Sequence, residues 1–279
     1  MNRLHTAGAL VQATHALPSL AVTAFFTAVA LAAGMGSGRS ALLALAVLVG
    51  QASIGWANDF LDAGRDRAAA RADKPIARGQ VNDGVVGACA AVALVADVPL
   101  SLLVGWRAGA AHLIAVGSAW MYNLQLKYSW ASWAPYVLSF GLVPVIVAAG
   151  LPGSPLPQAT LVAAGSCCGI AAHFANTVGD AADDALTGVR GLPQRMGPAA
   201  STVIAAGFVA VASVLLVVAT AAAVPALVAA GVGVAGALAM PALLRGSSDR
   251  HVAFRVVIAA VALMVVAFVV SGGDRLVAK

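Results

Sequence analysis

Long apolar runs recur along the whole chain, and they constrain its fold more strongly than any other feature. Each run holds about 17 to 23 residues, and a helix of that length crosses the ~30 Å hydrocarbon core of a bilayer at 1.5 Å per residue. Apolar residues make up 61% of the chain and charged residues 10%, whereas a soluble domain carries about 25% charged residues. The pattern predicts an all-α polytopic membrane protein that forms a single membrane domain over residues 1–279. Its nine transmembrane helices are predicted at residues 14–33, 40–57, 84–104, 108–124, 134–151, 158–178, 199–221, 223–244 and 252–271.

The distribution of basic residues predicts how these helices are oriented. If the N-terminus faces the cytoplasm, 12 of the 16 Lys and Arg residues fall on the cytoplasmic side, and the positive-inside rule favours this orientation. The C-terminus is then predicted on the opposite side. The net charge of +5 therefore reflects membrane orientation. No basic helix, zinc spacing or aromatic platform indicates a nucleic-acid partner.

All 11 acidic residues are aspartates, and most of them fall in two short windows. The first window, just after the second apolar run, holds Asp59, Asp62 and Asp66. If the helix continues through it, the i, i+3, i+7 spacing places these side chains on one face. The second window, after the sixth run, holds Asp180 and Asp184 at i, i+4 spacing. An even number of predicted spans separates the windows, so both are predicted on the cytoplasmic face.

Clustered carboxylates need a positive partner, because like charges at these spacings repel each other. Oxygen-only clusters without His or Cys are typical of Mg²⁺ or Ca²⁺ sites rather than of zinc sites. Mg²⁺ takes one or two carboxylates and completes its coordination with water and substrate phosphates. Basic residues that can meet phosphate oxygens lie at Arg67, Arg71, Lys74, Arg78 and Lys127. Together these features indicate a site for a diphosphate headgroup that carries a lipid tail.

Both windows carry motifs of a known family. The string NDFLDAGRD at residues 58–66 matches the NDxxDxxxD motif of the UbiA superfamily of intramembrane prenyltransferases, and DAADD at residues 180–184 matches its second, DxxxD motif. The pair Tyr122 and Lys127 resembles the Tyr/Lys element that follows the family's fourth span. The chain resembles the family along essentially its whole length.

The resemblance implies a fold and a set of metal ligands. The implied fold is a UbiA-type bundle of nine helices around a central cavity, capped by cytoplasmic loops at about 58–83, 125–133 and 179–198. The implied cofactor is Mg²⁺, as two ions that bridge the motifs to the diphosphate. One ion is then held by Asn58 and Asp62, and the other by Asp180 and Asp184.

The resemblance also implies roles for other side chains. Asp59 and Asp66 support the metal ligands or position basic side chains, and Lys127 joins them as a catalytic residue. The implied diphosphate-binding residues are Arg67, Arg71, Lys74 and Lys127. Candidates for lining the cavity are His15, Tyr122, Tyr136, His173 and Asn176.

The main functional prediction is an Mg²⁺-dependent prenyltransferase that ionises an isoprenyl diphosphate and transfers the prenyl group to a lipophilic or aromatic acceptor. Metal and cations stabilise the departing diphosphate and leave an allylic carbocation in a dry cavity. The alternative is a UbiA-type terpene cyclase, in which the substrate's own alkene attacks the cation. A membrane transporter is a third class, because intramembrane acids are common in transporters, but paired diphosphate motifs on one face disfavour it. The predicted partners are the isoprenyl diphosphate and the lipid bilayer.

Overall fold

The structure, a computed structural model, describes residues 3–72, 74–247, 249 and 251–278. Within these residues the chain forms helices joined by short connections, and no β-strand is present. The helices are α1 Arg3–Ala13, α2 Ala16–Ala32, α3 Ser37–Ala68, α4 Asp83–Val104, α5 Trp106–Leu124, the 3₁₀ helix η1 Leu126–Tyr128, α6 Ala134–Gly150, α7 Ala159–Thr187, α8 Leu192–Ala219, α9 Val224–Gly246, α10 Val252–Val270 and the 3₁₀ helix η2 Gly273–Leu276.

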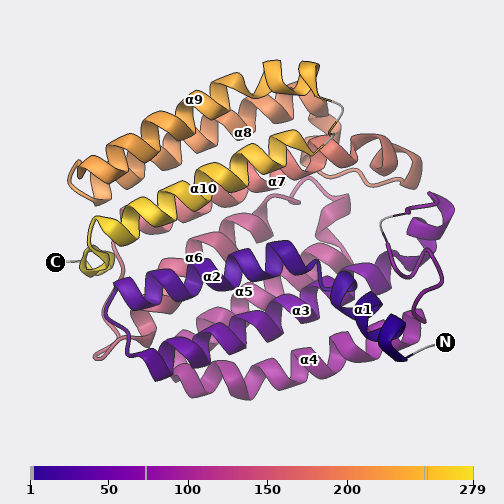
Figure 1. Cartoon of the computed structure of the whole chain (residues 1–279), viewed down its shortest axis with the longest axis horizontal. Coiled ribbons are helices and arrows are strands. Elements are labelled where there is room, and N and C mark those ends of the chain that lie inside the picture. Colours follow the sequence, from indigo (N-terminus) through magenta and orange to yellow (C-terminus); the bar gives the residue numbers. More distant parts are fainter. Residues whose placement is uncertain (1–2, 73, 248, 250, 279) are drawn as a thin grey trace.

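The long helices lie side by side in one bundle (Figure 1). Each helix from α2 to α10 packs against the next one along the chain. The last helix, α10, also packs against α7 and α2, so the end of the chain returns to its beginning and closes the bundle. The N-terminus and C-terminus lie at opposite ends of the helices (Figure 1).

Six helices are long and apolar enough to cross a membrane: α3, α4, α7, α8, α9 and α10. The pair α1 and α2, bent by 58°, makes a seventh span if it is counted as one. The helix α6 is shorter, with 17 residues, and α5 carries the polar residues Arg107, His112 and Asn123. The prediction of an all-helical integral membrane protein is therefore confirmed. Length and composition support six or seven spans rather than the predicted nine, although each predicted range coincides with one helix from α2 to α10.

The first predicted span, residues 14–33, begins in a bend instead of a continuous helix. His15 adopts the left-handed backbone conformation (φ 54°, ψ 56°) between α1 and α2, which breaks the helix. Gly55 of α3 lies directly against this bend, because a Cβ atom there would sit 2.6 Å from the carbonyl oxygen of Thr14. The missing side chain at Gly55 lets the bend approach α3, and this places His15 beside the first acidic motif.

The helices α3 and α7 continue beyond the predicted spans. With 32 and 29 residues, they are about 48 and 44 Å long, well above the ~30 Å of the hydrocarbon core. The segment 58–83, predicted as a cap loop, is therefore helical as far as Ala68. The segment 179–198 is likewise helical except at residues 188–191, where Gly188 (φ 76°) ends α7. Both acidic motifs consequently lie on helices.

One acidic residue lies inside the apolar bundle. Asp97 of α4 is completely buried, and its Oδ1 accepts a hydrogen bond of 3.0 Å from Ser101 Oγ. The same hydroxyl lies 2.8 Å from Nδ1 of His112 in α5. Gly50 of α3 leaves space for the carboxyl group, since a Cβ there would lie 3.3 Å from Asp97 Oδ2. The hydroxyl of Ser101 therefore links Asp97 of α4 to His112 of α5, whereas Asp97 Oδ2 has no hydrogen-bond partner in the described part of the chain.

Candidate active site

The first acidic motif lies on the C-terminal extension of α3. Asp59, Asp62 and Asp66 are buried, with exposed fractions of 1, 4 and 5%. Because α3 is continuously helical here, their spacing puts them on one face, as predicted. Buried carboxylates lack the water that would solvate their charge, so cations must lie close to them.

Lys74 provides the cation at Asp59. Its Nζ lies 2.6 Å from Asp59 Oδ1, and His15 Nε2 lies 2.9 Å from the same oxygen. The ammonium is also 3.1 Å from His15 Nε2 and 3.4 Å from Asn58 Oδ1. Lys74 comes from the segment after α3 and is itself buried. The bend before α2 and the connection after α3 therefore meet at Asp59.

Asp62 pairs with two cations. Its Oδ1 accepts a hydrogen bond from Lys127 Nζ, and its Oδ2 lies 2.6 Å from Arg65 Nη2. Asn58 donates from Nδ2 to Asp62 Oδ2 at 3.3 Å and to Asn123 Oδ1 of α5 at 3.2 Å. Burial lowers the pKa of Lys127, and the carboxylate of Asp62 opposes this shift because it favours the ammonium form. A residue 65 positions away in sequence is thus held within the first motif.

The second acidic motif lies on the C-terminal extension of α7. Arg71, from the segment after α3, approaches it with Nη1 at 3.3 Å from Asp183 Oδ2 and 3.7 Å from Asp180 Oδ1. Asp184 accepts a hydrogen bond of 2.9 Å from Gln194 Nε2 of α8. A cation that follows the first motif in sequence therefore pairs with the second motif in space.

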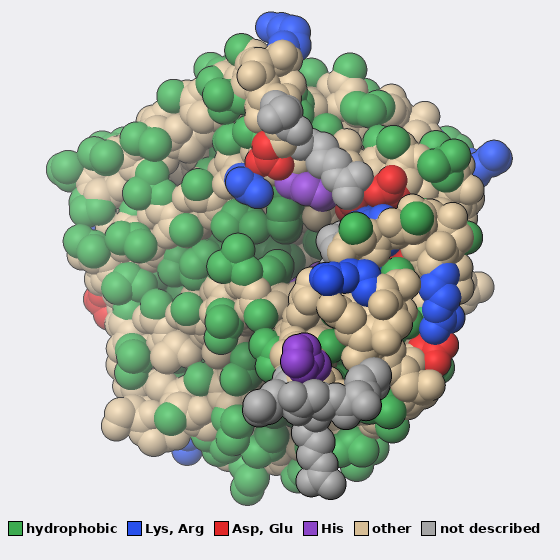
Figure 2. All heavy atoms as spheres, turned by 45° about the vertical axis from the view of Figure 1, so that its right-hand side comes forward, with side chains coloured by type: hydrophobic (Ala, Val, Ile, Leu, Met, Phe, Trp, Pro, Cys, Tyr) green, Lys and Arg blue, Asp and Glu red, His purple; other side chains and the backbone are tan. Residues whose placement is uncertain are grey.

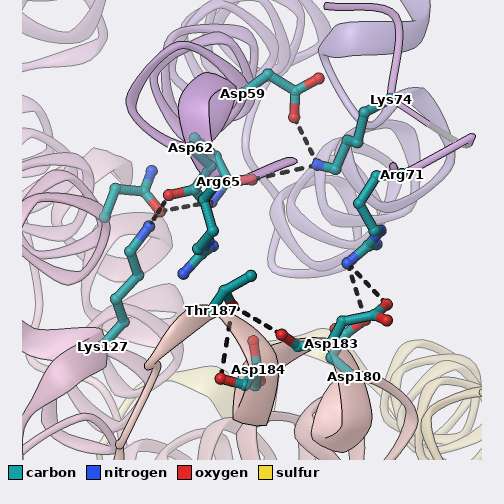
Figure 3. Close-up of polar contacts among 12 residues, drawn as sticks. Asp59, Asp62, Arg65, Arg71, Lys74, Lys127, Asp180, Asp183, Asp184 and Thr187 are labelled. Carbon is teal, nitrogen blue, oxygen red and sulfur yellow. Dashed lines mark hydrogen bonds and ion pairs between the residues drawn. The ribbon is translucent and has the colours of Figure 1, made fainter. Parts of the chain in front are cut away.

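The two motifs face each other. Figure 3 shows the acids of α3 on one side and those of α7 on the other, with Lys127 at one flank and Lys74 and Arg71 at the opposite flank. Arg71 points across the gap toward Asp180 and Asp183 (Figure 3). On the molecular surface, a hollow with hydrophobic walls opens beside basic, acidic and histidine side chains (Figure 2). The two motifs, which the sequence predicts at the same end of the bundle, therefore lie next to each other in the structure.

The oxygen atoms available as metal ligands in this site suit a divalent cation of the Mg²⁺ type. The predicted ligands Asn58, Asp62, Asp180 and Asp184 offer only carboxylate and amide groups. Two oxygens, Asp59 Oδ2 and Asp180 Oδ1, are buried without a hydrogen-bond partner in the described part of the chain. Among the residues that the structure describes, no group of three or more His, Cys, Asp or Glu side chains converges in a geometry that could hold a metal ion. Mg²⁺ does not need such a group, because one or two carboxylates, water and phosphate complete its shell.

An aromatic cluster joins α5, α6 and α7. The rings of Tyr122, Tyr136 and His173 have centroids 4.6 to 5.7 Å apart, and Phe140 stacks on Tyr136 at 6.4 Å. These three predicted cavity residues thus form one contact group, whereas His15 lies apart from it at Asp59. Aromatic faces carry negative charge density and attract cations.

The predicted cap segment 125–133 packs tightly against α7 and α8. Ser132 Oγ lies 3.0 Å from His173 Nε2 and accepts a hydrogen bond of 2.9 Å from the backbone N–H of Leu192. Gly191 allows this approach, because a Cβ there would lie 2.8 Å from Ser132 Oγ and 2.9 Å from the carbonyl oxygen of Lys127. These contacts fix η1, and with it Lys127, at the site.

One predicted diphosphate ligand lies outside the site. Arg67 pairs with Asp83, at the start of α4, at 2.9 Å, and both side chains are substantially exposed. A helix turns by about 100° per residue, so Arg67 points away from the face that carries Asp66. In this structure Arg67 therefore pairs outside the acidic motifs, and its contact with the diphosphate stays a prediction. Asn176 is half-buried in α7, about one turn before Asp180.

Three residues belong to the site although no role was predicted for them. Arg65 pairs with Asp62, and its i, i+3 spacing in the sequence is a signal that indicates this contact. Asp183 meets Arg71, and its place inside the second acidic window is a weaker signal. Gln194 meets Asp184 across the α7–α8 connection, and no spacing rule indicates that contact.

Several solved structures share this fold. A digeranylgeranylglyceryl phosphate synthase is 16% identical, with 97% of this chain and 99% of that chain covered and a TM-score of 0.68. A UbiA homologue from Archaeoglobus fulgidus bound to GPP and Mg²⁺ is 14% identical, with 93% and 98% covered and a TM-score of 0.70. The apo structure of a UbiA homologue from Aeropyrum pernix K1 is 16% identical, with 97% and 99% covered and a TM-score of 0.69.

Sequence comparison assigns the family. No curated protein matches the chain. The model of the UbiA prenyltransferase family matches residues 16–261, which include both acidic motifs and the segment that carries Lys127. The chain belongs to the UbiA prenyltransferase family.

Proposed function

We propose that this protein is an Mg²⁺-dependent prenyltransferase that ionises an isoprenyl diphosphate and transfers the prenyl group to a lipophilic or aromatic acceptor. The observation that carries the proposal is the meeting of two acidic motifs, from α3 and α7, with Lys74, Arg71 and Lys127 at one end of an apolar bundle. Relatives of the same fold from Archaeoglobus fulgidus bound to Mg²⁺ with GPP or DMAPP support it.

The basic side chains are proposed to bind the diphosphate. Lys74, Arg71 and Lys127 approach the site from two different connections, so they can contact the ligand from different sides. Charge-assisted hydrogen bonds to phosphate oxygens are stronger than neutral ones. Asp59 positions Lys74 through the contact of 2.6 Å, and a similar supporting role is proposed for Asp66.

The metal ligands are proposed to be Asn58 and Asp62 for one Mg²⁺ ion and Asp180 and Asp184 for the other. When bound, Mg²⁺ stabilises the negative charge on the departing diphosphate. In the reaction the allylic C–O bond breaks, its electron pair leaves with the diphosphate, and the prenyl carbon becomes a cation. The acceptor attacks this cation, forms the new bond to the prenyl carbon and then loses a proton. Lys127 and Arg71 contribute fixed positive charge at the oxygen that leaves.

The cation must be kept from water until the acceptor attacks it. The hollow in Figure 2 has hydrophobic walls, and we propose that these walls keep water from the cation when substrate is bound. The aromatic cluster of Tyr122, Tyr136 and His173 joins three helices of the bundle, and we assign to its tyrosine faces the stabilisation of the cation. The site is proposed to face the cytoplasm, as the distribution of Lys and Arg predicts.

The proposal is tested with the purified protein, Mg²⁺ and isoprenyl diphosphates from C10 to C25, with and without a quinone precursor or lipid acceptor. Diphosphate release and organic products are measured, the latter by mass spectrometry. EDTA is expected to abolish release and added Mg²⁺ to restore it. Asp62→Ala and Asp180→Ala should abolish turnover while the protein remains monodisperse. Full activity in chelator would refute the metal dependence, and cyclic hydrocarbon formed without acceptor would identify a terpene cyclase instead.

A further inference from the structure

A pocket lies inside the α7–α8 hairpin, beside the second acidic motif, and no aspartate lines it in the described part of the chain. Its volume is about 480 Å³, and its apolar wall includes Ala181, Ala185, Val189, Pro193 and Pro198. The pocket is explained by a bend in α8, where Gly197 has non-helical backbone angles (φ 83°, ψ 166°) and Pro198 follows. Proline has no N–H to continue the helical hydrogen bonds, so the first turn of α8 diverges from the rest of the helix.

Two arginines give this pocket a positive charge. Of the described residues that line it, Arg190 and Arg195 are basic and none is acidic. Arg195 is held in place, since its Nε donates to the carbonyl oxygen of Arg190 at 2.7 Å and its guanidinium carbon lies 4.7 Å from the ring centroid of Trp130. In the described part of the chain neither arginine pairs with a carboxylate, in contrast to Arg65 and Arg71. Both side chains are exposed, so their guanidinium groups are accessible to a ligand, and two such groups in one pocket favour a phosphate, which matches their fork of donors.

The apolar wall and the position of the pocket indicate what kind of phosphate it takes. The pocket lies where α7 ends and α8 begins, at the end of the bundle that carries both acidic motifs. That end is predicted to be cytoplasmic, and anionic lipid headgroups lie at the cytoplasmic surface of membranes. We propose that the pocket between Arg190 and Arg195 binds the phosphate headgroup of an anionic membrane lipid, with the adjoining part of the lipid against the apolar wall.

Gln194 connects this pocket to the second acidic motif. It lines the pocket, and its Nε2 donates to Asp184 Oδ2 at 2.9 Å. A headgroup held by Arg195 fixes the first turn of α8, and with it the contact between Gln194 and Asp184. Gln194 is therefore assigned as a positioning residue for Asp184. This coupling rests on the proposed function, because Asp184 is a proposed Mg²⁺ ligand, whereas the lipid site does not depend on it.

The binding test uses the full chain in nanodiscs of phosphatidylcholine with phosphatidylglycerol, followed by transfer to detergent and native mass spectrometry. Wild type is expected to retain phosphatidylglycerol in preference to phosphatidylcholine. The double variant Arg190→Gln, Arg195→Gln should bind it at least about tenfold more weakly, because two charge-assisted contacts are lost. The control is Arg107→Gln, since Arg107 also stacks on a tryptophan, Trp106, at 5.2 Å but lies outside the pocket. It should retain the lipid like wild type.

Three results would overturn the lipid site: equal retention by the double variant, equal retention of phosphatidylcholine by wild type, or displacement of the lipid by an equal concentration of inorganic phosphate. The last result would assign the pocket to a free anion. If the double variant does not fold, Arg195→Lys replaces it in the test. Lysine keeps the positive charge but lacks the planar fork of donors, so this variant is expected to bind phosphatidylglycerol with an affinity between those of wild type and a variant without the charge.

The coupling test compares the Mg²⁺ dependence of diphosphate release in nanodiscs with and without phosphatidylglycerol. The anionic lipid is expected to lower the Mg²⁺ concentration needed by wild type but not by Gln194→Ala, and the comparison is made at a phosphatidylglycerol content at which native mass spectrometry shows lipid bound to both proteins. An equal lipid effect in both proteins would refute the coupling. If neither protein releases diphosphate, the proposed function fails, while lipid retention still decides the site.

Discussion

Replacing Lys127 by methionine separates the charge of this side chain from its packing, because methionine is unbranched and similar in length. Lys127 is 4% exposed and donates to Asp62 Oδ1. Asp62 keeps Arg65 on its other oxygen at 2.6 Å, so Lys127→Met leaves one oxygen rather than the whole carboxylate without a cation. The expected loss in the free energy of unfolding is therefore about 1–3 kcal/mol, the cost of one unsatisfied buried group, and not the ~3–5 kcal/mol of an isolated buried pair.

The effect of Lys127→Met on turnover follows from its proposed contact with the diphosphate. Such a charge-assisted bond contributes about 1.5–3 kcal/mol, which corresponds to about one to two powers of ten in kcat/KM. The Mg²⁺ requirement should not change, because Asp62 remains. Lys127→Arg should recover part of the loss, since the guanidinium differs in reach and geometry.

The assay for Lys127→Met is steady-state kinetics over a Mg²⁺ titration, together with thermal unfolding in detergent. Arg255→Met is the control, because Arg255 is 73% exposed and pairs with Asp249 at 3.1 Å. An exposed pair contributes little to stability, so this variant should resemble wild type in both measurements. If Lys127→Met matches wild type in kcat/KM, Lys127 serves only as a counter-ion of Asp62, and its proposed contact with the diphosphate is wrong.

Two further predictions concern topology and packing. For topology, single cysteines are introduced at the exposed positions Ala68 and Leu186 in a background without the three native cysteines. They should react with a membrane-impermeant thiol reagent only after the cytoplasmic face of the membrane is made accessible. Labelling in intact cells would show that the predicted orientation is wrong. Gly55→Ala should lower stability by about 1–3 kcal/mol, because its Cβ would lie 2.6 Å from Thr14 O. At Gly64 in the same helix an added Cβ would have no atom within 4 Å, so Gly64→Ala should leave the melting temperature unchanged or slightly raised. Equal losses of stability in the two variants would refute the packing argument.

The sequence predicts those features of the site that depend on local periodicity. Apolar runs locate the helices, and the spacing of Asp59, Asp62 and Asp66 gives their common face once α3 continues to Ala68. Counting spans places the second motif at the same end of the bundle. These inferences succeed because they use only the rise and turn of a helix, together with the cost of placing charge in lipid.

The pairing of cations with acids is not predictable in this way. Lys127 pairs with Asp62 across 65 positions, and this contact depends on how the segment 125–133 packs against Gly191. Arg67 and Arg71 lie in the same short segment, yet Arg67 pairs with Asp83 and Arg71 crosses to the other motif. Local charge spacing does not distinguish the two, because Arg67 still lies on α3, whereas the path of the backbone after Ala68 decides where Arg71 points.

The ion pairs of the site bear on how its two ligands bind. Lys74, Arg71 and Lys127, proposed to bind diphosphate, all contact aspartates in this structure. Mg²⁺ alone must compete with the three basic side chains for the carboxylates. Diphosphate alone must draw these side chains away from the buried aspartates and so leave the aspartates without a cation. Each ligand by itself therefore leaves unbalanced charge in the site. Together they exchange partners, since the cations turn to the diphosphate while Mg²⁺ takes their place. Diphosphate is therefore expected to raise the affinity for Mg²⁺ at least about fivefold, and Mg²⁺ to raise that for diphosphate equally. Calorimetric titration of each ligand with and without the other measures this coupling, and independent binding would show that the ion pairs stay intact in the loaded site.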